Sequence, residues 1–234
     1  KCRTDYIVNG PDDCFFFLST RADDIETKTN DRAFCARTKD GGRTIEFLSY
    51  ITMDKARSVM PSTVKGRDGR LITALRRRWD GDYEKIMMLK KTRPDLVEKS
   101  KQGEKPEEFQ SKEQKNWIDV YESRDEGKSW QFLSKVAVTD PTGERNGNPP
   151  AMVKLADGRL CVAYGYRGEP LGIRAKISCD DGKTWGNEII LRDDGYNWDI
   201  GYPRMAQRPD GKLVTIYYYS SEENPEQYIA ATIW

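Results

Sequence analysis

Hydrophobic and polar residues alternate along the chain in short runs that indicate β-strands joined by tight turns. β-Branched and aromatic residues are frequent in the runs Leu71–Leu75, Leu160–Tyr164 and Leu213–Tyr219. Each run follows an Asp-Gly pair and one basic residue. Because Asp-Gly supplies the positive φ angles of a primed hairpin turn, each run is predicted to be the second strand of a β-hairpin.

The hairpin pattern recurs three times in register. Pro61, Pro150 and Pro203 each lie seven residues before the Asp of an Asp-Gly pair. Pro suits the start of a strand, where its missing N–H is not needed for the ladder. Three hairpins in register indicate a repeat architecture rather than isolated turns.

A second motif lies between the hairpins and fits Ser-x-Asp-x-Gly-x-Ser/Thr-Trp. Its two full copies contain Ser123, Asp125, Gly127 and Trp130, and Ser178, Asp180, Gly182 and Trp185. A weaker copy begins at Thr38. Ser, Thr and Asp side chains bond nearby backbone N–H groups in turns, and Gly takes the left-handed conformation. We therefore predict a structural role for these residues, with both Trp side chains largely buried.

This motif resembles the Asp-box, or bacterial neuraminidase repeat, of sialidase-like β-propellers. Repeats of one kind or the other extend from Thr38 to Tyr219, so the resemblance covers nearly the whole chain. It implies an all-β propeller with four-stranded blades. About four blades fit the chain, at roughly 1–52, 53–138, 139–195 and 196–234.

Two arrangements agree with this number of blades. The chain is either a compact four-bladed ring whose last outer strand comes from elsewhere, or the C-terminal part of a larger propeller. The resemblance implies six blades in the complete ring. The start at Lys1 without a leader or cap favours the larger propeller.

The spacing of the motifs changes within the second blade. Asp125 follows Pro61 by 64 residues, whereas Asp180 follows Pro150 by 30. The excess falls at 93–115, which is crowded with charges of both signs. We predict a solvated insertion with a short helix, either a surface excursion or a loop that shapes a substrate cleft. Outside it, no helix longer than about three turns is expected.

Composition excludes several functions. The chain has 234 residues, and 39 basic against 38 acidic residues give a net charge of +1. Nucleic-acid binding by bulk charge needs a basic surplus and is not predicted. No apolar run approaches the ~18 residues of a membrane span. The absence of His excludes Ser–His–Asp catalysis and zinc–histidine sites. No metal or cofactor is predicted, and the resemblance implies a secreted or periplasmic protein that binds carbohydrate.

A ligand site in a propeller lies over the central channel, where the chain leads into first strands and out of second strands. Arg78 and Arg167 each lie ten residues after a hairpin Asp, at the end of a second strand. Tyr166 precedes Arg167, and Asn148 and Asp199 lie before first strands. Arg side chains form paired hydrogen bonds with carboxylates, and aromatic rings pack against sugar rings. An anionic saccharide is therefore predicted as the ligand.

The resemblance implies a Tyr nucleophile with a Glu partner. Tyr202, followed by Pro203 and the last Asp-Gly hairpin, matches the position of that Tyr. The alternative is a ring that only packs at a blade junction. The catalytic candidates are Tyr202, Asp199 and Glu144, and Glu169 is a second candidate for the partner.

The resemblance also implies three Arg side chains on the substrate carboxylate. Arg167, Arg174 and Arg204 are the candidates, with Arg78 in reserve. Together with Asn148, Tyr166, Asp199 and Tyr202, these three are predicted to converge at one end of the channel. The sequence departs from the family in lacking an Arg-Ile-Pro triplet, since Val59-Met60-Pro61 takes its place. Asp80 and Asp82 correspond to the general acid by position only.

Three functions agree with these residues. The first is a sialidase-like glycoside hydrolase that acts on an acidic glycan. The second is a propeller that binds a carbohydrate or a protein without catalysis. The third is a polysaccharide lyase on the same scaffold. Fold alone does not decide between them.

Overall fold

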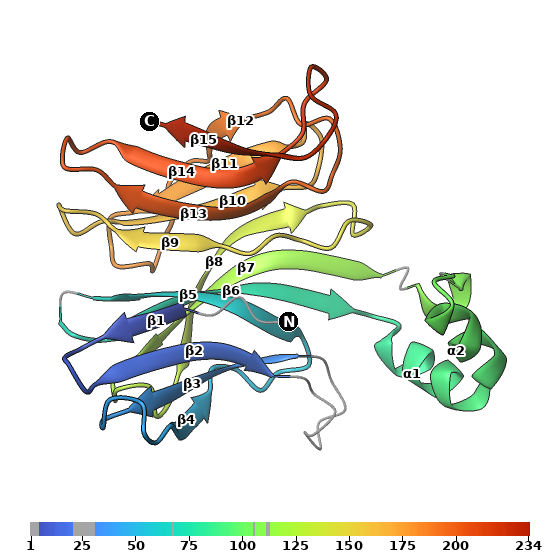
Figure 1. Cartoon of the computed structure of the whole chain (residues 1–234), viewed down its shortest axis with the longest axis horizontal. Helices are drawn as coiled ribbons and strands as arrows, with labels where there is room; N and C mark the ends of the chain where they lie inside the picture. The colour runs from blue at the N-terminus through green and yellow to red at the C-terminus, as the bar shows by residue number, and fades with distance from the viewer. Residues whose placement is uncertain (1–4, 21–30, 67, 105, 111–112) are drawn as a thin grey trace.

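The computed structural model describes residues 5–20, 31–66, 68–104, 106–110 and 113–234. These residues form four antiparallel sheets that follow chain order (Figure 1). The first two sheets contain β1 (Asp5–Val8), β2 (Cys14–Thr20), β3 (Arg32–Thr38) and β4 (Glu46–Tyr50), then β5 (Arg57–Lys65), β6 (Leu71–Asp80), β7 (Gln114–Ser123) and β8 (Gln131–Asp140). The last two contain β9 (Ala151–Lys154), β10 (Leu160–Tyr166), β11 (Gly172–Ser178) and β12 (Ile189–Arg192), then β13 (Gly201–Gln207), β14 (Leu213–Tyr219) and β15 (Tyr228–Ile233).

The sheets are arranged as the blades of a β-propeller, which confirms the predicted all-β fold. Each blade packs against the next through buried apolar side chains, for example Ile72 and Val120 of the second blade against Val162 of the third. The first strands β1, β5, β9 and β13 contact one another in turn. Figure 1 shows the blades side by side in an arc, with the first and last at opposite ends.

The hairpin turns differ from the predicted primed type. In the third blade Leu155 N–H donates to Arg159 O and Gly158 N–H donates to Leu155 O, both at 2.8 Å. These bonds define a three-residue loop in which Gly158 has a φ of +89° and Asp157 is not left-handed. The Asp carboxylate instead accepts the N–H of the following Arg159 at 3.0 Å. The prediction of a primed turn was wrong because one left-handed glycine suffices when the loop contains three residues.

The Asp-box side chains pin turns, as predicted. Ser178 Oγ accepts the Gly182 N–H at 2.8 Å, and Asp180 accepts the Thr184 N–H at 2.9 Å. Gly182 has a φ of +88°. Ser123, Asp125 and Gly127 repeat these contacts in the second blade. Trp130 and Trp185 retain only a minor exposed surface, and each indole packs at the edge of the core between two blades, as predicted.

Helices occur in the excursion between β6 and β7, which Figure 1 shows beside the sheets. They are α1 (Tyr83–Thr92), α2 (Pro94–Lys101) and the 3-10 turn η2 (Glu107–Phe109). The excursion therefore begins before the predicted 93–115, because Ile86 provides a buried face for α1. No helix in the described part of the chain is long and apolar enough to cross a membrane.

Candidate functional site

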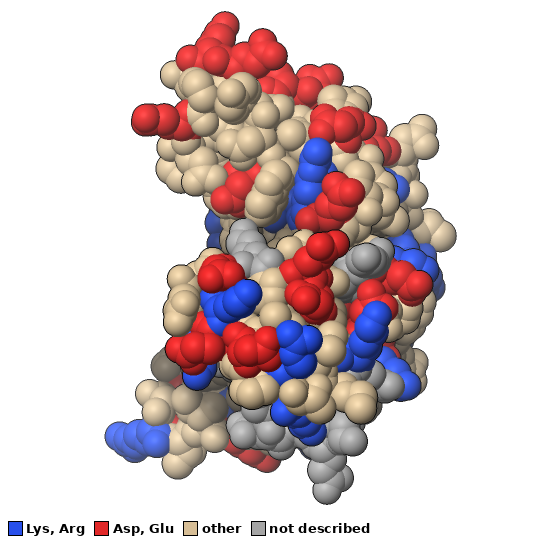
Figure 2. Space-filling view, turned by 90° about the vertical axis from the view of Figure 1, so that its right-hand side faces the viewer, with Lys and Arg blue, Asp and Glu red and all other residues tan. Residues whose placement is uncertain are grey.

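Several polar side chains from different blades meet where second strands end and first strands begin. In Figure 1 the second strands β2, β6 and β14 end on the right, and Figure 2 views the molecule from that side. The surface there is hollowed, and acidic and basic side chains border the hollow. We use the name rim cluster for Arg76, Arg167, Asp199, Tyr202 and Tyr218.

Tyr202 lies at the start of β13 and is 37% exposed. Its φ of +50° is left-handed, and the pairing of β13 with β14 is interrupted there by a bulge. Its hydroxyl accepts a hydrogen bond from Arg76 at 3.3 Å. Its ring centroid lies 5.6 Å from that of Tyr218. Tyr202 thus has an exposed ring and a hydroxyl that a buried cation contacts.

Arg76 lies within β6 and is buried. Besides Tyr202, its guanidinium donates to Asn146 O at 3.2 Å. Burial lowers the pKa of Arg76 to about 10, and the Tyr202 hydroxyl opposes this shift. A pKa near this value leaves Arg76 charged at neutral pH, so a buried cation lies at hydrogen-bond distance from the Tyr202 oxygen.

Arg167 connects the loop before β9 with the loop before β13. Its guanidinium donates to Asn146 O at 2.7 Å, to Asp199 at 3.2 Å and to the Tyr218 hydroxyl at 3.2 Å. It also lies 5.0 Å from the ring centroid of Trp198, which is 42% exposed. Since Arg167 is only 3% exposed, its donors are directed to the protein rather than to solvent.

Asp199 is the accessible anion of the rim cluster, with 49% of its side chain exposed. It accepts hydrogen bonds from Tyr218 at 2.6 Å and from Gln227 at 3.0 Å. Burial raises its pKa, but these bonds and the Arg167 charge outweigh burial and hold the pKa below its ordinary value. For Tyr218, burial and then the bond to Asp199 raise the pKa. Asp199 is therefore ionised and Tyr218 protonated at neutral pH.

The structure brings some of the predicted residues together. Tyr202, Asp199 and Arg167 converge, because Tyr218 contacts all three. Arg204 is exposed on β13, two residues beyond Tyr202. The general location of the site agrees with the sequence prediction.

Other predicted residues have different surroundings. Arg174 is buried within the third blade, where it donates to Arg192 O at 2.5 Å, pairs with Glu188 at 3.3 Å and lies over the Tyr166 ring. Asn148 is fully buried. Neither side chain is placed to contact a substrate. Side chains alternate between the two faces of a strand, and that of Arg174 lies on the face that packs inside the blade. Asn148 is enclosed at the junction of two blades.

The surroundings of Arg78 and Glu144 also differ from those expected of residues that contact the substrate. Arg78 pairs with Asp80 at 2.8 Å and contacts the Asn146 side chain. Glu144 is exposed, and among the described residues its carboxylate forms no hydrogen bond with Tyr202. The Tyr202 hydroxyl contacts Arg76, and the Glu partner, Glu144 or Glu169, stays a prediction.

Sequence reasoning missed Arg76, Tyr218, Trp198 and the Asn146 carbonyl. A signal was present for two of them, since Arg76 and Tyr218 each lie eight residues after a hairpin Asp. Residues eight and ten positions after the turn lie on the same side of a strand.

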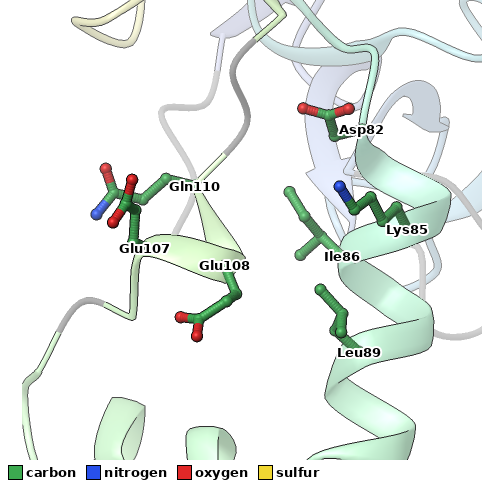
Figure 3. A pocket seen from close by; sticks show the side chains of 7 residues that line it. All are labelled: Asp82, Lys85, Ile86, Leu89, Glu107, Glu108 and Gln110. Carbon is green, nitrogen blue, oxygen red and sulfur yellow. The ribbon is translucent and has the colours of Figure 1, made fainter.

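A separate pocket of about 480 Å³ lies in the helical excursion. Figure 3 shows Ile86 and Leu89 of α1 facing Glu107 and Glu108 across it. No residue of the rim cluster lines this pocket. We place the candidate site at the rim cluster because buried charges and exposed aromatic rings meet there. Among the described residues, no group of His, Cys, Asp and Glu is arranged to hold a metal ion.

Comparisons with known proteins agree with the fold. A BNR repeat-like domain matches residues 108–215. A protein of unknown function from Dyadobacter fermentans superposes with a TM-score of 0.65 at 23% identity, covering 94% of this chain and 50% of that one. An α-L-arabinanase from Penicillium chrysogenum, in complex with arabinobiose, gives a TM-score of 0.63 at 18% identity over 98% of this chain and 61% of that one.

A more distant likeness connects the chain to sialidases. A Trypanosoma rangeli sialidase gives a TM-score of 0.52 at 14% identity over 95% of this chain and 30% of that one. No curated protein sequence matches the chain. The chain spans between half and three fifths of the length of the first two solved structures named above.

Proposed function

Since the chain is a sialidase-like β-propeller with BNR repeats, we propose that the whole protein is a glycoside hydrolase whose site includes the rim cluster. The observation that carries the proposal is the contact between the Tyr202 hydroxyl and the buried Arg76 at 3.3 Å, beside the exposed carboxylate of Asp199. The likeness to an arabinanase and a sialidase supports a carbohydrate substrate.

In this proposal Tyr202 is the nucleophile. Its oxygen bonds to the anomeric carbon while the glycosidic C–O bond breaks, and the proton that Tyr202 loses passes through water to the departing sugar oxygen. Water then hydrolyses the glycosyl–tyrosine bond and returns a proton to Tyr202, whose oxygen Arg76 contacts throughout. Asp199 is ionised and accepts sugar hydroxyls or stabilises positive charge on the sugar ring in the transition state. Trp198 and Tyr202 provide aromatic faces for sugar rings.

The contacts of the arginines bear on the choice of sugar. Arg167 and Arg174 are both 3% exposed and bonded to protein acceptors, which leaves Arg204 as the exposed member of the three predicted carboxylate ligands. A three-arginine clamp is therefore disfavoured, and a neutral glycan fits the site better than a sialic-acid-type glycan. A location outside the cytoplasm remains a prediction from the family.

A second candidate is carbohydrate binding without hydrolysis. It is favoured by one observation, the absence of a Glu partner for Tyr202 among the described residues. Without such a base, the Tyr202 proton has no assigned acceptor.

The test is turnover of a panel of glycosides by the whole protein. The panel contains arabinan oligosaccharides, a fluorogenic sialoside and a uronan. We expect reducing sugar to be released from the arabinan oligosaccharides and little fluorophore from the sialoside. Release of sialic acid would restore the acidic-glycan prediction, and an unsaturated product from the uronan would indicate a lyase. Binding without any product would support the second candidate.

A further inference from the structure

The side chain of Asn148 joins the third blade to the fourth at the residue that carries the candidate nucleophile. Its Oδ1 accepts the Tyr202 N–H at 3.0 Å and the Gly165 N–H at 3.2 Å. Its Nδ2 donates to Ile200 O at 2.8 Å. The side chain has no exposed surface, so all of these bonds are shielded from water. A buried amide with these partners is strongly oriented.

Two glycines make room for this amide. A Cβ at Gly201 would lie 2.4 Å from Asn148 Nδ2, and a Cβ at Gly165 would lie 2.8 Å from the same atom. Gly201 also has a φ of +112°. Residues with side chains would displace Asn148 at both positions, so the surrounding backbone is shaped around the amide.

The amide holds Tyr202 in an unfavourable backbone conformation. Tyr202 has a φ of +50°, a left-handed conformation that is strained for a residue with a Cβ. The hydrogen bond from Tyr202 N–H to Asn148 compensates by fixing the bulge. In that conformation the Tyr202 hydroxyl reaches Arg76.

The same amide is connected to Arg167. Ile200 O accepts from Asn148 Nδ2 at 2.8 Å and from Arg167 at 3.2 Å. One buried side chain thus fixes the backbone on which both Arg167 and Tyr202 depend.

We propose that Asn148 is a positioning residue that holds the Tyr202 hydroxyl at Arg76. The inference rests on the proposed function, because a Tyr202 hydroxyl that takes part in catalysis requires a fixed position. It replaces the sequence prediction that Asn148 contacts the substrate.

The test compares Asn148→Ala with a matched control, Ser62→Ala, in the whole protein. Ser62 also accepts a backbone N–H of the neighbouring blade, that of Met152 at 2.9 Å, but it does not touch the rim cluster. We expect both variants to lose similar thermal stability. Asn148→Ala should also lower kcat by about 100-fold, the effect of a misplacement near 1 Å, with a smaller change in KM. Ser62→Ala should leave kcat unchanged.

A double substitution separates positioning from stability. If Asn148 acts through Tyr202, adding Tyr202→Phe to Asn148→Ala should lower kcat by only about tenfold more, so that the double variant is about as slow as Tyr202→Phe alone. The proposal is overturned if Asn148→Ala keeps wild-type kcat, or if Tyr202→Phe has its full effect in both backgrounds.

A conservative variant covers the case in which Asn148→Ala does not fold. Asn148→Asp keeps an acceptor for the two N–H groups, and its buried carboxyl has a raised pKa. Below that pKa the protonated acid also donates to Ile200 O, so activity relative to wild type should recover as the pH falls. A constant ratio of activities would contradict the proposal.

Crystal structures of wild type and Asn148→Asp at neutral pH separate this inference from the proposed function. If the wild type hydrolyses no glycoside, the proposed function fails. The positioning role is then still supported if Tyr202 leaves Arg76 in the variant, and overturned if Tyr202 stays in place.

Discussion

Arg167 combines burial with an unusually large number of acceptors. It donates to three backbone carbonyls, to Asp199 and to the Tyr218 hydroxyl, and it lies against the Trp198 ring. These partners come from the loop before β9, the loop before β13 and β14. The residue was predicted to bind the substrate, but its contacts make it a support for the residues around it.

This role predicts a large effect of Arg167→Ala on stability. The substitution removes the cation beside Asp199 and one donor from each of three carbonyls, and removal of one partner from a buried charged network costs about 3–5 kcal/mol. Chemical denaturation of the whole protein measures the loss. The exposed Arg204 provides a control, since Arg204→Ala should change stability by no more than about 0.5 kcal/mol. Equal effects of the two substitutions would contradict the account.

The sequence allowed the position of the site to be predicted better than its members. The hairpin register identified Tyr202 and Arg167 correctly as rim residues. It did not identify Arg76, because we considered the residue at the end of the strand and not the one two positions earlier on the same side. Tyr218 was missed for the same reason, since it also lies two positions before the end of the register that we considered.

At the scale of elements, each Asp-box ties its blade to the preceding one. Trp185 Nε1 donates to Ser134 at 2.9 Å, and Ser134 Oγ donates to Gly182 O at 2.5 Å. Trp130 contacts Ser49 of the first blade in the same way, at 3.1 Å. The motif itself was visible in the sequence. Ser134 and Ser49, which accept the Trp N–H bonds, could not be predicted, because no local sequence pattern specifies contacts between distant strands.

These hydrogen bonds between blades predict that Ser134→Ala destabilises the protein. The substitution removes the partner of the Trp185 N–H and of the Gly182 carbonyl, and unpaired buried polar groups cost about 1–3 kcal/mol. Urea denaturation should show this loss. Ser100→Ala, on the exposed surface of α2, should show none. A stability of Ser134→Ala equal to that of wild type would show that the ties do not hold the blades together.

The Asp-box carboxylate also predicts a dependence on pH. Burial raises the pKa of Asp180, but hydrogen bonds from Thr184 and Ser178 outweigh it and lower the pKa from 3.8 to about 2. Because the folded pKa is depressed, the stabilisation is complete above the unfolded value and is lost as the pH falls towards 2. Asp180→Asn should therefore have a lower melting temperature than wild type at pH 5, and the difference should shrink towards pH 2. A difference independent of pH would contradict this.

At the scale of the whole molecule, both ends of the arc expose apolar sheet faces. Ile216, Ile229 and Ile233 are 45–75% exposed on the last blade, and Tyr6 and Val8 are 64–65% exposed on the first. Ile216 occupies the same hairpin position as Ala74 and Ala163, which are fully buried against the next blade. The faces have the character of blade interfaces, which is consistent with the predicted larger ring. The number of blades in that ring stays a prediction.

A larger ring predicts that Ile216 is covered in the whole protein. Ile216→Asp would then bury an unpaired carboxylate against the next blade and lower the free energy of unfolding by at least about 2 kcal/mol. Denaturation of the whole protein tests this. A change of no more than about 0.5 kcal/mol, as at an ordinary surface position, would show that the face is open to solvent.

The order of the blades and most strand limits could be predicted because each repeat carries its own turn signals. The helical excursion was placed too late in the chain, since the apolar residues Ile86 and Leu89 lie outside the charged run that marked it. The curvature of the arc, which brings Tyr202 to Arg76, comes from packing between blades. No local pattern in the sequence encodes that distance.

The central claim is that Tyr202 acts chemically at the rim cluster. The most direct test is steady-state hydrolysis of the best glycoside by the whole protein, wild type against Tyr202→Phe, with glycan affinity measured in parallel by calorimetry. The substitution removes one hydroxyl and almost no packing volume, so the fold and the affinity should change little. We predict that kcat falls by about 10³-fold or more while binding persists. Turnover by Tyr202→Phe at the wild-type rate would contradict the claim.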